Sequence, residues 1–372
     1  MRRILIDKKI KDFAADYVKD IKTVVGDVEA CLRNLVEELK KQTTKIYVCT
    51  PDNVNRYKGD EYQSVSEYVG KIAGHYDEIN NLLPSKYDGV MSDIDGRLGT
   101  IKVDEVLVKL RGKEKQPLYE MIVDIMGYNK VRKEVLPQYV NKLEIKTCVY
   151  CNAQFAITTL IEDVCEKIML GKPGRPKKAI VIPRRGGYYE MDHNKPKSRY
   201  PYLCTNFYNL QPCCSSCNKR KSAQDLSFSV YYEDGDPEPA PLRFAISEQD
   251  VIDFHTNGKC KGVKPYLCDE ANPTKRVVAR KDGTLAEQFN YIFDIDKIYA
   301  EHEDEVEELL WRNRIYTQGI VSATNSQFKD LEIEDFDFGR YILGTYPNRE
   351  DALKRPLTAM KQDIWEQVIK DE

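Results

Sequence analysis

Two Cys-x-x-Cys pairs constrain the fold of this chain more than any other feature. They are Cys148–Cys151 and Cys214–Cys217, and a long segment separates them. Together they supply four thiolates, which is the ligand set of a structural tetrahedral zinc site. Cys213 precedes the second pair but lacks the required spacing. Buried free thiols and a redox Cys-x-x-Cys are the alternatives, although a redox motif would not explain the second pair. The pattern therefore predicts that Zn²⁺ holds two distant segments together.

The remaining sequence context favours a reducing compartment. The start of the chain has no apolar segment of the kind that a signal peptide needs, and no apolar run approaches the length of a membrane span. We therefore expect a cytoplasmic protein without a membrane partner, where paired cysteines bind metal more often than they form disulfides. The other cysteines are expected to be ordinary small apolar side chains: Cys31, Cys49, Cys165, Cys204, Cys260 and Cys268.

Apolar periodicity predicts a mainly helical N-terminal region over residues 1–145. Between Phe13 and Leu39 the apolar residues recur at three- and four-residue steps, which indicates one long amphipathic helix. Weaker helical patterns cover residues 62–82 and 117–141. Since this region contains no ligand cluster and no run of like charge, we expect it to be a scaffold or a partner-docking region.

The sequence pattern changes in a central module, residues 146–232. Short strands are expected at 155–160, 179–182 and 188–191, with a turn at 184–187. A proline-rich acidic linker follows at 233–241 and leads to a mainly helical C-terminal region, residues 242–372, with a long helix expected over 289–310. The predicted fold class is α+β, with helical regions on both sides of a central module that contains strands.

Polar residues with catalytic chemistry are concentrated in the central module. Asp192 and His193 directly follow a predicted strand, and Asn209 and Asn218 come later in the module. Phosphodiester hydrolysis requires an activated water and a cation that neutralises charge on the phosphate oxygens. A histidine can act as the base, and carboxylate and amide oxygens are ligands for hard divalent cations. Asp192, His193 and Asn218 are therefore the candidates for these roles.

The same part of the chain carries a block of positive charge. From Lys172 to Lys221 there are twelve Lys or Arg against Glu190 and Asp192, although the whole chain has a net charge of −3. Such a block is typical of a phosphate-binding face, and a solvated loop is the alternative. The candidate nucleic-acid-binding residues are Lys195, Lys197, Arg199, Lys219, Arg220, Lys221 and Arg175. Arg175 lies in Pro-Gly-Arg-Pro, which resembles the core of an AT-hook, or it belongs to an ordinary basic loop.

The order of these motifs resembles a known family. Cys-x-x-Cys, then Asp-His-x-x-Pro-x-Ser, then Asn-Leu-x-Pro-x-Cys-x-x-Cys-Asn-x-x-Lys is similar to the zinc-stapled subgroup of HNH endonucleases, which have the ββα-metal fold. The resemblance covers Cys148 to Ser222. Two features depart from the pattern: Asn218 stands in place of a histidine, a common variant that still offers an oxygen ligand, and the insert at 161–187 is long.

The resemblance implies a role for each matched residue. His193 would be the general base, and Asp192 and Asn218 would bind one catalytic Mg²⁺ or Mn²⁺. Asn209 would hold the loop that orients the histidine, and Lys221 would contact phosphate. Structural Zn²⁺ would be bound by four cysteines: Cys148, Cys151, Cys214 and Cys217.

Flanking segments extend the resemblance and leave the substrate open. Residues 200–203, 206–210 and 355–367 are similar to bacterial HNH proteins encoded beside an ATPase in anti-phage systems of the Septu type. This implies a DNA-cutting defence nuclease whose helical regions dock onto a regulatory ATPase. An HNH-type RNase acting on structured RNA such as tRNA is an alternative, because the site recognises a phosphate and not a base. A non-catalytic zinc-containing nucleic-acid-binding module is another, although it would not need Asp192, His193 and Asn218.

Overall fold

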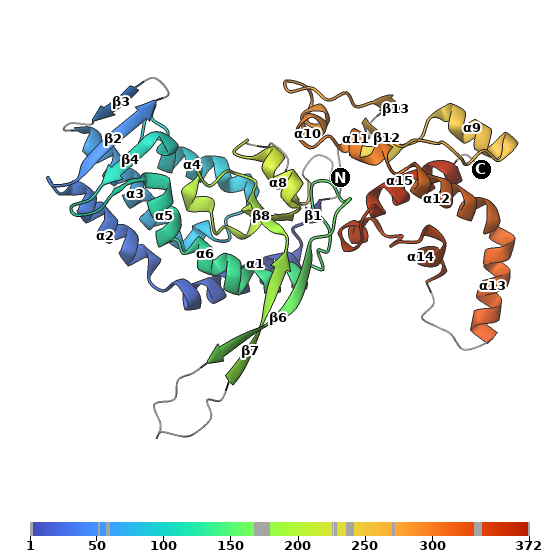
Figure 1. Cartoon of the computed structure of the whole chain (residues 1–372), viewed down its shortest axis with the longest axis horizontal. Coiled ribbons are helices and arrows are strands. Elements are labelled where there is room, and N and C mark those ends of the chain that lie inside the picture. Colours follow the sequence, from blue (N-terminus) through green and yellow to red (C-terminus); the bar gives the residue numbers. More distant parts are fainter. Residues whose placement is uncertain are drawn as a thin grey trace.

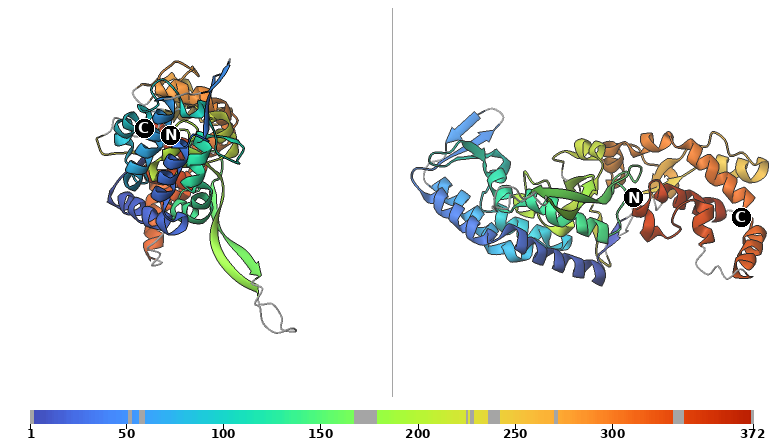
Figure 2. Two further views of the ribbon diagram at one scale, coloured as in Figure 1. Left: turned by 90° about the vertical axis from the view of Figure 1, so that its left-hand side faces the viewer. Right: turned by 60° about the horizontal axis from the view of Figure 1, so that its bottom comes forward.

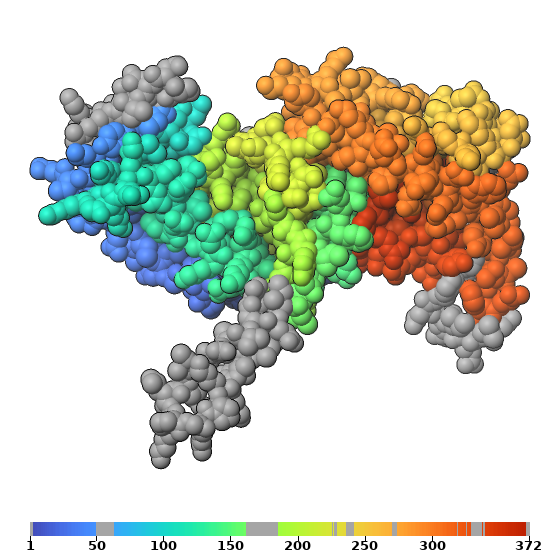
Figure 3. All heavy atoms as spheres, viewed as in Figure 1, coloured from blue at the N-terminus to red at the C-terminus, as the bar shows by residue number. Residues whose placement is uncertain are grey.

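The chain folds into an elongated α+β structure with several small sheets (Figure 1). The computed structural model describes residues 3–50, 53–56, 60–166, 179–224, 226, 229–235, 242–269, 272–330 and 337–370. The N-terminal region forms one end of the molecule and the C-terminal region the other, with the central module between them (Figures 1 and 3). Among the described residues, no helix has the length and apolar character needed to cross a membrane.

The first predicted helix is two helices, α1 (Lys8–Val25) and α2 (Val28–Lys40). The chain breaks at Gly26, which has a φ of 75°, and the Asp27 side chain then accepts a hydrogen bond from the backbone N–H of Ala30. A glycine with positive φ ends a helix readily, and an aspartate at the N-cap starts the next one. The apolar periodicity continues across the break, so the prediction of a single helix was wrong although its buried face was identified.

The N-terminal region also contains a four-stranded antiparallel sheet that the sequence did not predict. Its strand order is β3-β2-β4-β5. These strands are β2 (Lys45–Thr50), β3 (Asn53–Arg56), β4 (Val106–Lys109) and β5 (Lys115–Pro117). The helices around it are α3 (Asp60–Ile79), α4 (Tyr87–Asp95) and α5 (Leu118–Ile125), with 3₁₀ turns at Pro84–Lys86 and Val103–Glu105.

The last helical segment of the N-terminal region contains a π-helical turn. The helix α6 (Tyr128–Lys130) continues into the π turn η3 (Val131–Val135) and then into α7 (Leu136–Lys142). Pro137 lies in the first turn of α7, where it has no N–H to donate and its ring crowds the preceding helical turn. This proline accounts for the widened turn.

The central module begins with a ribbon that projects from the body of the molecule (Figures 1 and 2). Its antiparallel strands are β6 (Ile157–Glu166) and β7 (Ala179–Tyr188). The predicted turn at 184–187 was wrong, because these residues pair with β6 as part of β7. A second antiparallel pair, β8 (Glu190–His193) and β9 (Leu210–Cys213), precedes α8 (Ser215–Lys221), so two strands and a helix follow one another.

The N-terminus is joined to the end of the central module. The strand β1 (Ile4–Leu5) pairs in parallel with β10 (Tyr231–Tyr232).

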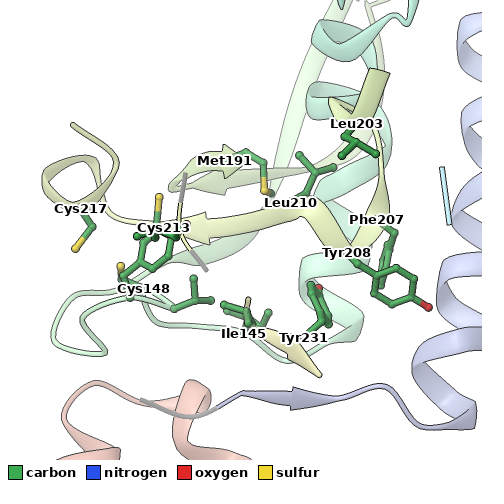
Figure 4. Close-up of a cluster of buried hydrophobic side chains, with 14 of the residues drawn as sticks. Ile145, Cys148, Met191, Leu203, Phe207, Tyr208, Leu210, Cys213, Cys217 and Tyr231 are labelled. Atoms are coloured by element: carbon green, nitrogen blue, oxygen red, sulfur yellow. The ribbon is translucent and has the colours of Figure 1, made fainter. Parts of the chain in front are cut away.

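Between β8 and β9 lie two 3₁₀ turns, Pro201–Leu203 and Phe207–Asn209. Figure 4 shows the buried cluster beneath them, with Phe207, Tyr208 and Tyr231 at one end and Cys148, Cys213 and Cys217 at the other.

The C-terminal region combines helices with a three-stranded antiparallel sheet. The strands are β11 (Leu242–Ala245), β12 (Tyr266–Asp269) and β13 (Asn272–Arg276), and β12 is central. The long helix predicted over 289–310 is interrupted at Asp294, which has a φ of 50°. The helices are α9 (Glu248–Asn257), α10 (Leu285–Phe293), α11 (Ile295–Ala300), α12 (Glu303–Ile315), α13 (Gln318–Asp330), α14 (Phe338–Leu343) and α15 (Thr358–Lys370), with a 3₁₀ segment at Arg349–Lys354.

Candidate functional site

The four predicted cysteines lie together. The Sγ atoms of Cys148, Cys151, Cys214 and Cys217 are all within 4.8 Å of one another, and all four side chains are buried. Four thiolates at about 2.3 Å from a tetrahedral Zn²⁺ place their sulfurs roughly 3.8 Å apart, so the cluster can hold a metal ion such as zinc. It joins the segment before β6 to the start of α8.

Local hydrogen bonds form the two cysteine turns. In the first, the Asn152 N–H donates to the carbonyl of Cys148 at 2.8 Å, and Asn152 itself adopts a φ of 51°. In the second, the Asn218 N–H donates to the carbonyl of Cys214 at 3.0 Å as the first turn of α8. Each turn therefore presents two thiols on one side, as the Cys-x-x-Cys spacing predicts.

The chemistry of the cluster favours a cation. All four side chains are buried, where a thiolate loses its hydration. A divalent cation would supply the charge that stabilises thiolates in this position. Cys213 is not part of the group: its Sγ lies 3.6 Å from the carbonyl oxygen of Glu190, and burial raises its pKa.

Asp192 is connected to both cysteine turns. It lies on β8 and is buried. The hydroxyl of Tyr150, between the two cysteines of the first pair, donates to its Oδ2 atom. The ammonium group of Lys221, one turn after Cys217 on α8, lies 3.1 Å from the same oxygen. The carboxylate is thus held by one donor from each of the two turns that form the cysteine cluster.

The position of Lys221 corrects the expectation that it contacts phosphate. Its side chain has 0 % of its surface exposed. Besides approaching Asp192, its Nζ atom donates to the carbonyl of His193 at 2.7 Å. A cation with these partners is not available to a nucleic acid, and it balances the buried charge of Asp192.

His193 is held in one neutral form. It is the last residue of β8 and is buried, and its ring lies 4.8 Å from that of Tyr128. Burial lowers the pKa of His193 to about 3, with smaller contributions from the positive charges of Lys197, Lys221 and Arg132. The Nε2 atom lies 3.0 Å from the carbonyl oxygen of Cys204. Since a carbonyl can only accept, Nε2 carries the proton and Nδ1 keeps a free lone pair.

Asn209 fastens the loop between β8 and β9. Its Oδ1 atom accepts from the Lys195 N–H at 2.7 Å, and its Nδ2 atom donates to the carbonyls of Lys195 and Leu203 at 3.1 and 3.0 Å. Because the Cys204 carbonyl that contacts His193 directly follows Leu203, these bonds fix the acceptor of the imidazole. This geometry agrees with the positioning role expected of Asn209.

Asn218 contacts a carboxylate on β8. Its Nδ2 atom donates to Oε2 of Glu190. Glu190 and Asp192 are two residues apart on β8, and Asn218 and Lys221 are one turn apart on α8, so the strand and helix meet in two adjacent contacts. Among the described residues, Asp192 and Asn218 are therefore neighbours in this arrangement without a direct hydrogen bond between them.

The predicted basic residues differ in their surroundings. Lys197, Arg199, Lys219 and Arg220 are exposed, and Lys195 is half-buried. The guanidinium group of Arg220 is paired with Asp294, after α10. The Nζ atom of Lys197 lies 5.0 Å from the centre of the Tyr128 ring, next to His193. Arg175 and the AT-hook-like segment lie outside the described residues.

Three residues at this site were missed by sequence reasoning. Tyr150 lies inside the first Cys-x-x-Cys, and Glu190 lies two residues before Asp192 on the same strand face, so both had a positional signal. Tyr128 is far away in the sequence and carried no such signal. Comparison of the chain with protein families, with curated proteins and with solved structures finds no match.

Proposed function

We propose that this protein is a metal-dependent endonuclease of the HNH type that hydrolyses phosphodiester bonds in DNA. The observation that carries the proposal is the state of His193. Its Nε2–H is bound by the Cys204 carbonyl, which fixes the tautomer and leaves Nδ1 as the proton acceptor. The free lone pair on Nδ1 can then take a proton from the attacking water, as general base catalysis requires. The order β8, β9, α8 beside a cysteine cluster is consistent with a ββα-metal module.

The donors around β8 and α8 suit a hard divalent cation. Asp192 and Asn218 would hold Mg²⁺ or Mn²⁺ as the resemblance implies, and Glu190 would add a third oxygen ligand. A carboxylate has about four lone-pair positions, so Asp192 can keep its contacts with Tyr150 and Lys221 and still offer one. The bound cation supplies positive charge at the phosphate oxygens. The cysteine cluster would hold Zn²⁺ in a structural role.

Replacement of His193 tests the catalytic assignment. We expect His193→Ala to cut no DNA in the presence of Mg²⁺ while it keeps its fold and about one zinc per chain. His75→Ala is the matched control, because His75 is partly exposed and forms ion pairs with Glu78 and Asp93 away from this site. Undiminished cleavage by His193→Ala would remove the assignment of the base.

The substrate class is tested by comparing the cleavage of three nucleic acids. Plasmid DNA, single-stranded DNA and total tRNA are incubated side by side with the protein and Mg²⁺. We expect DNA to be cut, since the resemblance points to a DNA nuclease that acts in the bacterial cytoplasm as the effector of an anti-phage system. Cleavage of tRNA alone would favour the RNase alternative.

The C-terminal region has a surface suited to a protein partner. Several large apolar side chains are exposed on its helices: Ile252, Trp311, Ile315, Ile320 and Tyr341. These side chains are accessible to an apolar surface of a partner protein. They support the part of the proposal in which a regulatory ATPase docks onto the helical regions. Co-purification of the full chain with the proteins of its host tests this part, and recovery without an ATPase under conditions that preserve activity would contradict it.

A further inference from the structure

A cavity of about 870 Å³ lies between the π turn η3 and the contact of β8 with α8. Asn129, Arg132 and Lys133 line it from the N-terminal region. Gly187, Glu190 and Asn218 line it from the central module. Its volume falls within the range of roughly 300–1,000 Å³ that is common for ligand pockets. The helical N-terminal region thus forms one wall of a cavity whose other wall carries two of the three proposed metal ligands, Glu190 and Asn218.

The N-terminal wall presents two adjacent cations. Arg132 and Lys133 lie in the π turn, and both are exposed, whereas Val131 and Val135 at its two ends are buried. Within the described part of the chain, neither cation has an ion-pair partner. Unpaired neighbouring cations in a concave surface attract anions, and π turns are frequent at functional sites.

The two walls are electrostatically complementary to a bound phosphate. Glu190 and Asn218 offer oxygen ligands for a divalent cation, and Arg132 and Lys133 offer positive charge and N–H donors from the other side. Arg132 is also close enough to His193 for its charge to contribute to the low pKa of that residue, after the larger effect of burial. A phosphate in this cavity would therefore lie beside Glu190 and Asn218, two of the proposed metal ligands.

We propose that this cavity binds the phosphodiester backbone of the substrate next to the bond that is cut, with Arg132 and Lys133 as its phosphate-binding residues. The inference rests on the proposed function and deepens it. It makes the N-terminal region part of the substrate site, in addition to any role in docking a partner. The resemblance implied that Lys221 contacts phosphate, but Lys221 is buried. The inference assigns this contact to Arg132 and Lys133, which belong to no sequence motif.

Salt-dependent binding tests the inference without cleavage. Fluorescence anisotropy of a labelled 20-base-pair DNA duplex, and in a second arm of a labelled RNA hairpin, is measured without added divalent metal. Each phosphate contact contributes about 0.9 to the slope of log K against log salt concentration. We expect Arg132→Ala/Lys133→Ala to reduce that slope by about 2 and to weaken binding on the order of tenfold at moderate salt. The arm in which the slope changes identifies the nucleic acid.

A second pair of charges provides the matched control. Arg111 and Lys113 are exposed in the turn between β4 and β5, and neither lines this cavity. Arg111→Ala/Lys113→Ala removes the same charge and should keep the wild-type slope. If the wild type binds and cuts nucleic acid but the two double variants have the same slope, the inference is wrong and the proposed function stands. If the wild type neither binds nor cuts DNA or RNA, both are wrong.

Discussion

The ammonium nitrogen of Lys221 lies 3.1 Å from Oδ2 of Asp192, and both side chains are buried. The hydroxyl of Tyr150 donates to the same carboxylate. Lys221 follows the second cysteine pair on α8, and Tyr150 lies within the first. The cysteine cluster and the carboxylate of the proposed metal site are thus parts of one buried network. A change at either cysteine turn should therefore alter the position of the Asp192 carboxylate.

Removing the Tyr150 hydroxyl should lower both the stability of the protein and its cleavage rate. Tyr150→Phe leaves a buried carboxylate with one donor fewer, which should cost about 1–3 kcal/mol in the free energy of unfolding and should lower the cleavage rate. Tyr139→Phe is the control, because the Tyr139 hydroxyl also donates to a carboxylate, that of Asp20 at 2.6 Å, and this contact involves neither Asp192 nor a cysteine turn. Urea unfolding and initial cleavage rates measure the two effects. Equal cleavage rates in the two variants would contradict the positioning role of Tyr150.

Replacing Lys221 should be strongly destabilising. Lys221→Met leaves Asp192 as an uncompensated buried charge, which typically costs about 3–5 kcal/mol. Adding Asp192→Asn to this variant removes the charge and should recover part of the loss. Lys219→Met, at an exposed position on the same helix, should change stability by no more than about 0.5 kcal/mol. A Lys221→Met protein as stable as the Lys219→Met protein would show that the pair is not buried in solution.

Substitutions at two nearby buried cysteines test whether the cluster binds a metal ion or only packs in the core. Cys217→Ser removes a predicted ligand and should abolish stoichiometric zinc, measured by inductively coupled plasma mass spectrometry. Cys213→Ser changes an equally buried thiol that contacts the Glu190 carbonyl, and it should keep about one zinc per chain. Cys217→Ser should also lower activity in conditions where the protein stays folded, because α8 then loses its attachment to the first cysteine turn. Full zinc content in Cys217→Ser would contradict the assigned ligand set.

The buried His193 should make stability depend on pH. Its pKa is about 3 in the folded chain and near 6.5 when unfolded, so the unfolded state binds the extra proton first as the pH falls. The contribution is fully present above pH 6.5 and is lost between about pH 6.5 and 3, which amounts to about 2 kcal/mol between pH 7 and 5. His193→Gln should flatten this part of the profile, measured by urea unfolding without added Mg²⁺.

His75 should behave in the opposite way. Hydrogen bonds to Asp93 and Glu78 raise its pKa, so its contribution is present at low pH and is lost as the pH rises through the folded-state pKa. His75→Gln should therefore remove stability at acidic pH instead of restoring it. Identical pH profiles for the His193→Gln and His75→Gln variants would contradict the burial of His193.

Several features could be predicted from the sequence because they depend on local geometry. A Cys-x-x-Cys turn places two thiols on one side whatever surrounds it, so the set of four cysteines was identified from spacing. Helical periodicity identified the buried faces of α1 and α2, and the coarse α+β class followed from the change of pattern after Thr147. The strands β3, β4 and β5 were missed because they have at most four residues each, whereas β2 was missed although its six residues include Ile, Tyr, Val and Thr, which favour strands.

Only the tertiary structure decided how the charged residues are used. A lysine in a basic run is ordinarily solvated, and nothing adjacent to Lys221 in the sequence indicates that α8 packs against β8 and buries its ammonium group beside Asp192. In the same way, Arg132 and Lys133 lie in a region without motifs, and they reach the cavity because η3 packs beside the central module. Spacing identified the four cysteines that lie together, whereas long-range packing determined which cations balance buried charge and which remain available to bind a phosphate.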